Sequence, residues 1–301
     1  MEERKKVYLL SGGLVPLFEN RHSLFLDEAT QNGLRALEQE YFTEFQRLLH
    51  GFDDRDDLGK FLWDVRFIPC TEIEDNLREM VTCKRLENSS TALPLISFDD
   101  VYCPDVADGH YSITRLMDPN NLAAGKSLGP RYGMPPLEEQ VRKIASKHGN
   151  QVDIMDIGVF DGETLTCELK ERFEKQGLTI RDAYVMFAGL GGVKNLAECG
   201  VNLWFAQAYD WIDWMEIRDM VGLDGRKVTC SKADHIANAF IPYSHNPADW
   251  ASIPEQFEGG FKTMYHKYFN KASEIMRAGG YKVQLAESSA SPVVRELIIS
   301  E

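Results

Sequence analysis

Residues 152–165, with the sequence VDIMDIGVFDGETL, decide the fold. Their apolar start at 152–155 predicts a buried strand, and the glycine-containing stretch 156–162 predicts a tight loop. A helix is expected over 164–176, because a threonine opens it and a glycine follows its last residue. The unpaired N–H groups of such a helix start suit an anion or a polar ligand, so the segment predicts a strand, a ligand loop and a helix start.

Strands and helices alternate on both sides of this segment. Such alternation predicts a parallel sheet with helices on both faces, so the expected fold class is α/β with a Rossmann-like parallel sheet. Residues 118–136 are rich in Asn, Gly and Pro and are expected to form a long loop. The other expected strands are 95–98, 111–115, 183–188 and 202–207, and the other expected helices are 135–147 and 193–199.

The ends of the chain have a different character from the middle, and we expect two domains. Residues 1–94 are expected to form an N-terminal α/β lobe or hood, and residues 95–301 the core with a C-terminal helical segment. The turn at 11–13, Ser-Gly-Gly, could bind an anion, but it lacks the spacing of a phosphate motif and such a turn is more often only a turn. The elements expected outside the middle are a strand at 7–10 and helices at 27–49 and 254–278.

The composition is that of an acidic globular protein, with 44% hydrophobic residues, 27% charged residues and a net charge of −14. This charge repels a sugar–phosphate backbone, so non-specific binding to nucleic acid or to an acidic membrane is not expected. No stretch reaches the roughly 18 to 20 apolar residues of a membrane span, and the charged start lacks the features of a signal peptide. The six cysteines include no C-x-x-C pair, which predicts reduced thiols and a cytoplasmic location.

Residues 152–165 resemble the signature of type I phosphoribosyltransferases, in which an apolar strand is followed by two acidic residues, a short loop, Thr-Gly-x-Thr and a helix. Flanking segments extend the resemblance over roughly residues 95–230. The strand that ends at Arg115 resembles the one that brings an arginine toward the pyrophosphate. Gly129-Pro130-Arg131 and the helix start after it resemble the loop and helix that precede the signature strand.

The resemblance implies transfer of a phosphoribosyl or related glycosyl group from a phosphoribosyl pyrophosphate-type donor to a nucleobase or related acceptor, assisted by Mg²⁺. Asp156 would hold ribose hydroxyls and the metal, and Arg115 and Arg131 would bind the pyrophosphate. A homodimer is a further expectation. The residues expected to bind substrate are Gly158, Asp161, Gly162, Glu163, Thr164, Glu216 and Asp219, although Glu216 and Asp219 also fit a buried ion pair with Arg218 that fastens the sheet edge.

The segment departs from the family pattern at three positions. Ile157 stands where the second acid is usual, Asp161 where threonine is usual and Glu163 where glycine is frequent. Two carboxylates beside a 5′-phosphate would repel it by about 1 kcal/mol for each unit pair at 4 Å, even in a water-like dielectric. An altered sugar donor, a bridging metal and loss of the original activity are therefore all open.

Two other readings of the segment remain. The spacing of Asp156, Gly158 and Gly162 also resembles the first motif of class I methyltransferases, in which S-adenosylmethionine lies across the loop. Against that reading, the next expected strand, 183–188, does not end in the acid that would bind ribose hydroxyls. The second alternative is a non-catalytic, nucleotide-binding descendant of the phosphoribosyltransferase fold.

Overall fold

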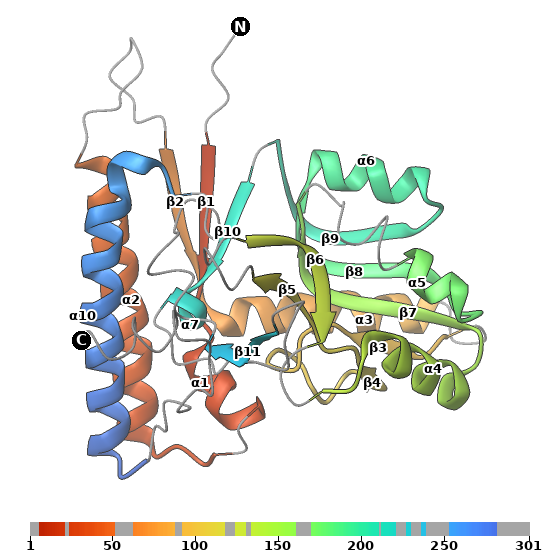
Figure 1. Cartoon of the computed structure of the whole chain (residues 1–301), viewed down its shortest axis with the longest axis horizontal. Coiled ribbons are helices and arrows are strands. Elements are labelled where there is room, and N and C mark those ends of the chain that lie inside the picture. The colour runs from red at the N-terminus through yellow and green to blue at the C-terminus, as the bar shows by residue number, and fades with distance from the viewer. Residues whose placement is uncertain are drawn as a thin grey trace, which may run out of the picture. The chain divides into compact units, whose positions relative to one another are not determined.

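The computed structural model of the chain describes residues 6–21, 24–51, 63–87, 92–117, 124–130, 134–160, 170–210, 212–220, 227–229, 236–238 and 253–281 (Figure 1). The chain forms two compact units and passes between them more than once. The first unit comprises Met1–Arg4, Pro69–Ile113 and Met134–Ile212, and the second comprises Lys5–Ile68, Thr114–Gly133 and Asp213–Glu301. Residues 94 and 95, where the sequence predicts a domain boundary, both lie in the first unit.

The first unit is built on a five-stranded sheet in the order β4-β3-β7-β8-β9. Each neighbouring pair in this sheet is parallel, which confirms the predicted α/β fold class with a parallel, Rossmann-like sheet. The apolar run that predicts the central strand is buried from Val152 to Met155. The strands are β3 Leu95–Ser97, β4 Gly109–His110, β7 Gln151–Val159, β8 Thr179–Gly189 and β9 Asn202–Tyr209.

Helices cover both faces of this sheet. On one face, the ammonium group of Lys84, from α3 (Cys70–Glu87), lies 3.8 Å from the centre of the Trp204 ring of β9. On the other face, Phe173 of α5 (Lys170–Lys175) packs against Phe98, with ring centres 6.2 Å apart. Figure 1 shows α3 behind the strands and α4 (Leu137–His148) and α5 in front of them. No pattern in the sequence predicts α3, whereas α4 confirms the helix expected at 135–147.

The helix α4 shows how local chemistry sets the limits of an element. Pro136 is its N-cap, two glutamates occupy its first turn, and Lys147 and His148 lie in its last turn, so the charges at both ends complement the helix dipole. Gly149 follows with a positive φ of 89°, a conformation that L side chains rarely adopt. The buried residues Leu137, Val141 and Ile144 recur at helical spacing and face the sheet side of the unit.

The structure corrects two of the predicted loops. Residues 156–159 belong to the strand β7 and not to a loop, because pairing with β8 continues as far as Val159 opposite Ala188. The glycine that suggested a turn, Gly158, instead lies under the Phe160 ring, where a Cβ would come within 2.9 Å of Cζ. In the expected loop 118–136, the strand β6 (Ala124–Pro130) pairs with β5 (Ile113–Met117).

The second unit contains a three-stranded sheet in the order β10-β1-β2, in which β1 and β2 are parallel. Its two long helices, α2 (Glu28–His50) and α10 (Glu258–Ala278), pack against each other through Tyr41 and Tyr268, whose ring centres are 4.9 Å apart. The strand and helices predicted at 7–10, 27–49 and 254–278 are therefore confirmed. The remaining elements are β1 Lys6–Ser11, α1 Leu14–Pro16, η1 Leu17–Arg21, β2 Trp63–Ile68, β10 Ile212–Glu216, α7 Ile217–Met220, β11 Lys227–Thr229, β12 Ile236–Asn238 and η3 Glu255–Phe257, with α6 Leu190–Glu198 in the first unit.

Two expectations from the composition can be compared with the described residues. None of the described helices is long and apolar enough to cross a membrane. The cysteines that the structure describes, Cys70, Cys83, Cys103 and Cys199, form no disulfide bond, as the absence of a disulfide framework in the sequence predicts. Burial raises the pKa of the Cys103 thiol to about 12, and the negative charge of Glu74 acts in the same direction, so this thiol is a packing group and not a nucleophile.

Candidate functional site

The direction in which the chain builds the parallel sheet changes between β3 and β7. From β3 the chain moves outward to β4 on one side, and from β7 it moves outward through β8 to β9 on the other side. In chain order the sheet is therefore arranged 2-1-3-4-5. In doubly wound sheets of this order the ligand binds in the crevice beyond the carboxyl ends of the strands that flank the change of direction. The fold thus selects the ends of β3 and β7 as the candidate site.

The strand β7 brings Asp156 to this point. Asp156 is half-buried and lies between two buried neighbours, Met155 and Ile157, whose side chains are on the opposite face of the strand. Its carboxylate oxygen Oδ1 accepts a hydrogen bond of 2.8 Å from the backbone N–H of Ile157. Ile157, which stands where the phosphoribosyltransferase pattern has a second acid, is therefore a core residue. Asp156 remains partly accessible.

Two more acidic residues lie near the carboxyl end of β3 and were not among the predicted site residues. Asp99 and Asp100 follow the apolar stretch that ends at Phe98, as Asp156 follows the apolar start of β7, and this shared pattern is the signal that could have found them. The carboxylate of Asp99 is buried, and its Oδ1 accepts a 2.6 Å hydrogen bond from the N–H of Val101. The Ser97 hydroxyl oxygen also accepts a 3.2 Å hydrogen bond from the backbone N–H of Asp99. Asp99 thus shapes the turn that leaves β3, and Asp100 is half-buried beside it.

The last described residue of the β7 segment, Phe160, is fastened to the start of α6. Its carbonyl oxygen accepts a 3.0 Å hydrogen bond from the N–H of Gly192. The approach of the two backbones is close, because a Cβ on Gly189 would lie only 2.4 Å from the same oxygen. The glycines at 189–192 therefore allow backbone contact, and Gly192 at the start of α6 already has an acceptor within the chain. This contact fixes the point from which the predicted ligand loop departs.

The structure describes only part of the predicted site. Asp156 and Gly158 lie on β7 at the change of direction, as expected for a site strand. Glu216, in the second unit, is buried and forms an ion pair with Arg218, which is fully buried, so the ion pair given as the alternative is present. The expected role of Glu216 in substrate binding stays a prediction. Arg115 lies on β5 and Asp219 on α7, but their side chains are outside the described residues, as are Arg131, Asp161, Gly162, Glu163 and Thr164 entirely.

The expected Mg²⁺ can be compared with the described side chains. Among them, no group of three or more His, Cys, Asp or Glu residues is placed to hold a metal ion. A magnesium ion commonly takes one or two carboxylates together with substrate phosphates and water, so Asp156 alone is a sufficient protein contribution only when a phosphorylated substrate supplies further ligands. Mg²⁺ therefore remains an expectation that depends on the donor.

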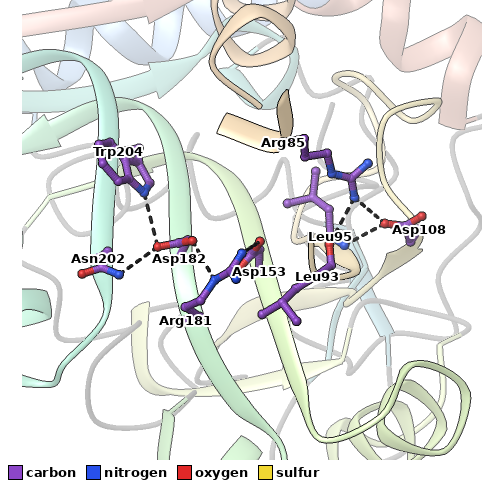
Figure 2. Close-up of polar contacts among 9 residues, drawn as sticks. All are labelled: Arg85, Leu93, Leu95, Asp108, Asp153, Arg181, Asp182, Asn202 and Trp204. Atoms are coloured by element: carbon purple, nitrogen blue, oxygen red, sulfur yellow. Dashed lines mark hydrogen bonds and ion pairs between the residues drawn. The ribbon is translucent and has the colours of Figure 1, made fainter. Parts of the chain in front are cut away.

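A buried polar network lies at the opposite, amino end of the same sheet (Figure 2). The guanidinium of Arg181 pairs with the carboxylates of Asp153 and Asp182, at 2.8 Å in each case. Asp182 also accepts a 2.9 Å hydrogen bond from the Asn202 amide and a 3.3 Å bond from the Trp204 indole. Burial raises the pKa of Asp153, although the hydrogen bond and charge of Arg181 act in the opposite direction.

A second, separate group of polar contacts joins α3 to β3 (Figure 2). Arg85 donates a 2.6 Å hydrogen bond to the Asp108 carboxylate, which also accepts a 2.8 Å bond from the backbone N–H of Leu95. Although burial opposes it, these donors lower the pKa of Asp108. Each of the three carboxylates, Asp108, Asp153 and Asp182, already accepts hydrogen bonds from within the chain, and the strand ends that bind ligands are at the other end of the sheet. These contacts therefore hold secondary-structure elements together and are not the candidate site.

Comparison of the chain with models of protein families and with curated proteins gives no match.

Proposed function

We propose that the chain is a phosphoribosyltransferase-like enzyme, which transfers a phosphoribosyl or related glycosyl group between a phosphoribosyl pyrophosphate-type donor and a nucleobase or related acceptor. One observation carries the proposal. The signature-like segment 152–165 begins on β7, the strand at which the sheet changes direction, and this is where a sheet of order 2-1-3-4-5 binds its ligand. The sequence resemblance and the topology thus support the same strand end independently.

The proposed roles follow from the position of each group. Asp156, half-buried on β7, would accept hydrogen bonds from ribose hydroxyls and would share Mg²⁺ with the donor. Residues 161–164 would bind the 5′-phosphate, and Arg115 and Arg131 would neutralise the departing pyrophosphate. Bond cleavage at C1′ creates an oxocarbenium-like centre, so such an enzyme acts mainly by positioning the donor and acceptor and by electrostatic stabilisation. Mg²⁺, when bound, would supply charge neutralisation of the pyrophosphate.

The topology also bears on the methyltransferase alternative. In doubly wound folds of the dinucleotide-binding order 3-2-1-4-5-6, the glycine-rich ligand turn follows the first strand of the sheet. Here Asp156 and Gly158 lie on the third strand in chain order, after β3 and β4. This position favours the phosphoribosyltransferase-like reading over a first-motif reading of the same residues.

Calorimetry on the purified chain tests the proposal. Phosphoribosyl pyrophosphate with Mg²⁺ and S-adenosylmethionine would be titrated separately into the wild type, Asp156→Asn and a control, Asp105→Asn. Asparagine keeps the oxygen that accepts from Ile157, and Asp105 is an exposed acid paired with Arg78, so both variants should fold. We expect saturable binding of the sugar donor that is lost in Asp156→Asn only. Binding of S-adenosylmethionine alone, or no loss in Asp156→Asn, would overturn the proposal.

A further inference from the structure

The strand β9 forms one edge of the five-stranded sheet. It pairs with β8 on its inner side over its whole length, from Asn202 opposite Asp182 to Tyr209 opposite Gly189. Within the described part of the chain, no strand is hydrogen-bonded to its outer side. The outward backbone N–H and C=O groups of an edge strand form a ready template for another strand.

The sequence of β9, NLWFAQAY, lacks the features that normally protect such an edge. It contains no charged residue, no proline and no glycine over eight residues, although the whole chain carries a net charge of −14. Exposed edges in monomeric proteins are usually short or carry charges, prolines or bulges. The other edge of the same sheet follows this rule, because β4 has only two residues and Asp108 precedes it.

The side chains of β9 agree with an uncovered edge. Asn202, Phe205, Ala206 and Ala208 are exposed, and Phe205 keeps 39% of its surface accessible. Asn202, Ala206 and Ala208 lie on one face of the sheet and Phe205 lies on the other, so neither face of the strand is fully covered by α3 or α6. The strand β9 is uncharged and accessible along its edge and on both faces. Such a strand is better suited to pair with another strand than to remain exposed to solvent.

We propose that β9 is the interface through which two copies of this chain pair, with the β9 strands antiparallel about a two-fold axis, so that one sheet continues across both copies. The proposal is independent of the reaction proposed above. A two-fold axis perpendicular to the sheet keeps each side chain on its own face, so residues that lie opposite each other must point to the same face. An axis at residue 206 meets this condition. It places Phe205 opposite Gln207 and Trp204 opposite Ala208 of the other copy, so that a large side chain meets a smaller one on each face and no charges are opposed.

Electrostatics favours a second copy at this strand over a contact elsewhere on the unit. Two molecules that each carry a net charge of −14 repel each other, and a contact that brings carboxylates together adds to this repulsion. The strand β9 brings eight uncharged residues of each copy into contact. A two-fold arrangement uses the same surface on both copies and closes after two, which also removes the exposed edge.

Sedimentation velocity over a range of protein concentrations, combined with hydrogen exchange, tests this interface. We expect a monomer–dimer equilibrium in the wild type, and amide protection of the peptides that cover β9 that increases with protein concentration. Ala206→Lys places two ammonium groups on opposite sides of the two-fold axis and should raise the dimer dissociation constant at least about tenfold. Ala208→Lys, a second exposed position on the same strand, should act in the same direction.

Ser146→Lys is the matched control, because Ser146 is exposed on α4, which packs against β7 and α5, and β8 separates β7 from β9. It should leave the dimer dissociation constant within about twofold of the wild type. A chain that stays monomeric at every concentration, or a dimer that survives both β9 substitutions, overturns the proposal. Concentration-independent protection of β9 in a monomer also overturns it, because the chain itself would then cover the edge.

Discussion

The carboxylate of Glu38 accepts a 2.7 Å hydrogen bond from the backbone N–H of Gly13. The same oxygen accepts a second bond, 2.8 Å long, from the N–H of Leu14. A Cβ on Gly12 would lie 2.6 Å from the other carboxylate oxygen, so the glycine is needed for this approach. The Ser-Gly-Gly turn therefore holds a carboxyl group, but that group is a side chain of α2 in the same unit and not a ligand.

The first prediction concerns the pH dependence of this contact. Burial raises the pKa of Glu38, although the Gly13 and Leu14 N–H groups and the charge of Arg35 act in the opposite direction. As the pH rises from the ordinary glutamate pKa toward the raised value, the unfolded chain releases its proton first, so the folded state loses stability over that window. Glu38→Gln stays neutral and keeps an acceptor oxygen, so it should not show this loss.

Urea denaturation at a series of pH values would measure the effect. We expect the unfolding free energy of Glu38→Gln, relative to the wild type, to increase as the pH rises above about 4.5, the ordinary glutamate value. Glu38→Ala is the control for the lost acceptor, because it leaves two buried N–H groups without their partner and should cost about 1–3 kcal/mol at acid pH. It has no carboxyl group at this position, so it too should not show the loss of stability as the pH rises. Parallel pH profiles for the wild type and Glu38→Gln would contradict the assignment.

An element of this fold can be predicted from the sequence when the residues that determine it are close together in the chain. The helix α4 and the start of β7 were predicted because caps, apolar spacing and a terminal glycine all lie within a few residues of each other. The continuation of β7 through residues 156–159 depends on pairing with β8, which a single segment does not reveal. The helix α3 was not predicted, since its buried residues Ile73, Leu77 and Val81 are sparse among charged neighbours.

In the candidate site and the buried contacts, too, residues set by their own segment can be predicted and long-range contacts cannot. Asp156 could be selected from its own segment, because an acid and two glycines follow an apolar run. The contacts of Glu38 with Gly13 and of Arg181 with Asp153 join residues about 25 positions or more apart in the chain, so they follow from tertiary packing and no local pattern indicates them. Buried carboxylates are the residues most easily mistaken for surface charge in a sequence.

The second prediction concerns the Arg181 network. Removal of the guanidinium in Arg181→Met leaves Asp153 and Asp182 buried without their cationic partner, and breaking a buried pair in this way costs about 3–5 kcal/mol. Chemical denaturation at neutral pH would measure the loss. Lys175→Met is a control, because its ion pair with Glu171 is mostly exposed and should change the unfolding free energy by less than about 1 kcal/mol. Equal effects of the two substitutions would argue against a buried network.

The third prediction concerns the backbone contact that fixes the end of β7. Gly189→Ala places a Cβ 2.4 Å from the Phe160 carbonyl oxygen, which is backbone and cannot move aside without shifting the strand. We expect a loss of about 1–3 kcal/mol in the unfolding free energy, together with weaker binding of any ligand at the site. Gly259→Ala, where a Cβ meets no atom within 4 Å, should leave the stability unchanged or slightly raised. A neutral Gly189→Ala would show that the end of β7 is not held by this contact.

The fourth prediction concerns Gln140, a buried residue of α4 whose side-chain amide bonds to the backbone of two other segments. Its amide nitrogen donates to the carbonyl oxygens of Ser112 and Pro135, at 3.2 and 2.8 Å, and its oxygen accepts a 2.9 Å bond from the Ser112 N–H. Gln140→Glu keeps the shape but turns the donor into an acceptor that faces two carbonyls, which should cost about 1–3 kcal/mol at neutral pH. Protonation restores one donor, so the cost should shrink in acid. Lys143→Gln, an exposed change on the same helix, should stay within about 0.5 kcal/mol of the wild type at every pH, and a Gln140→Glu variant that behaves in the same way would show that the amide does not hold this segment.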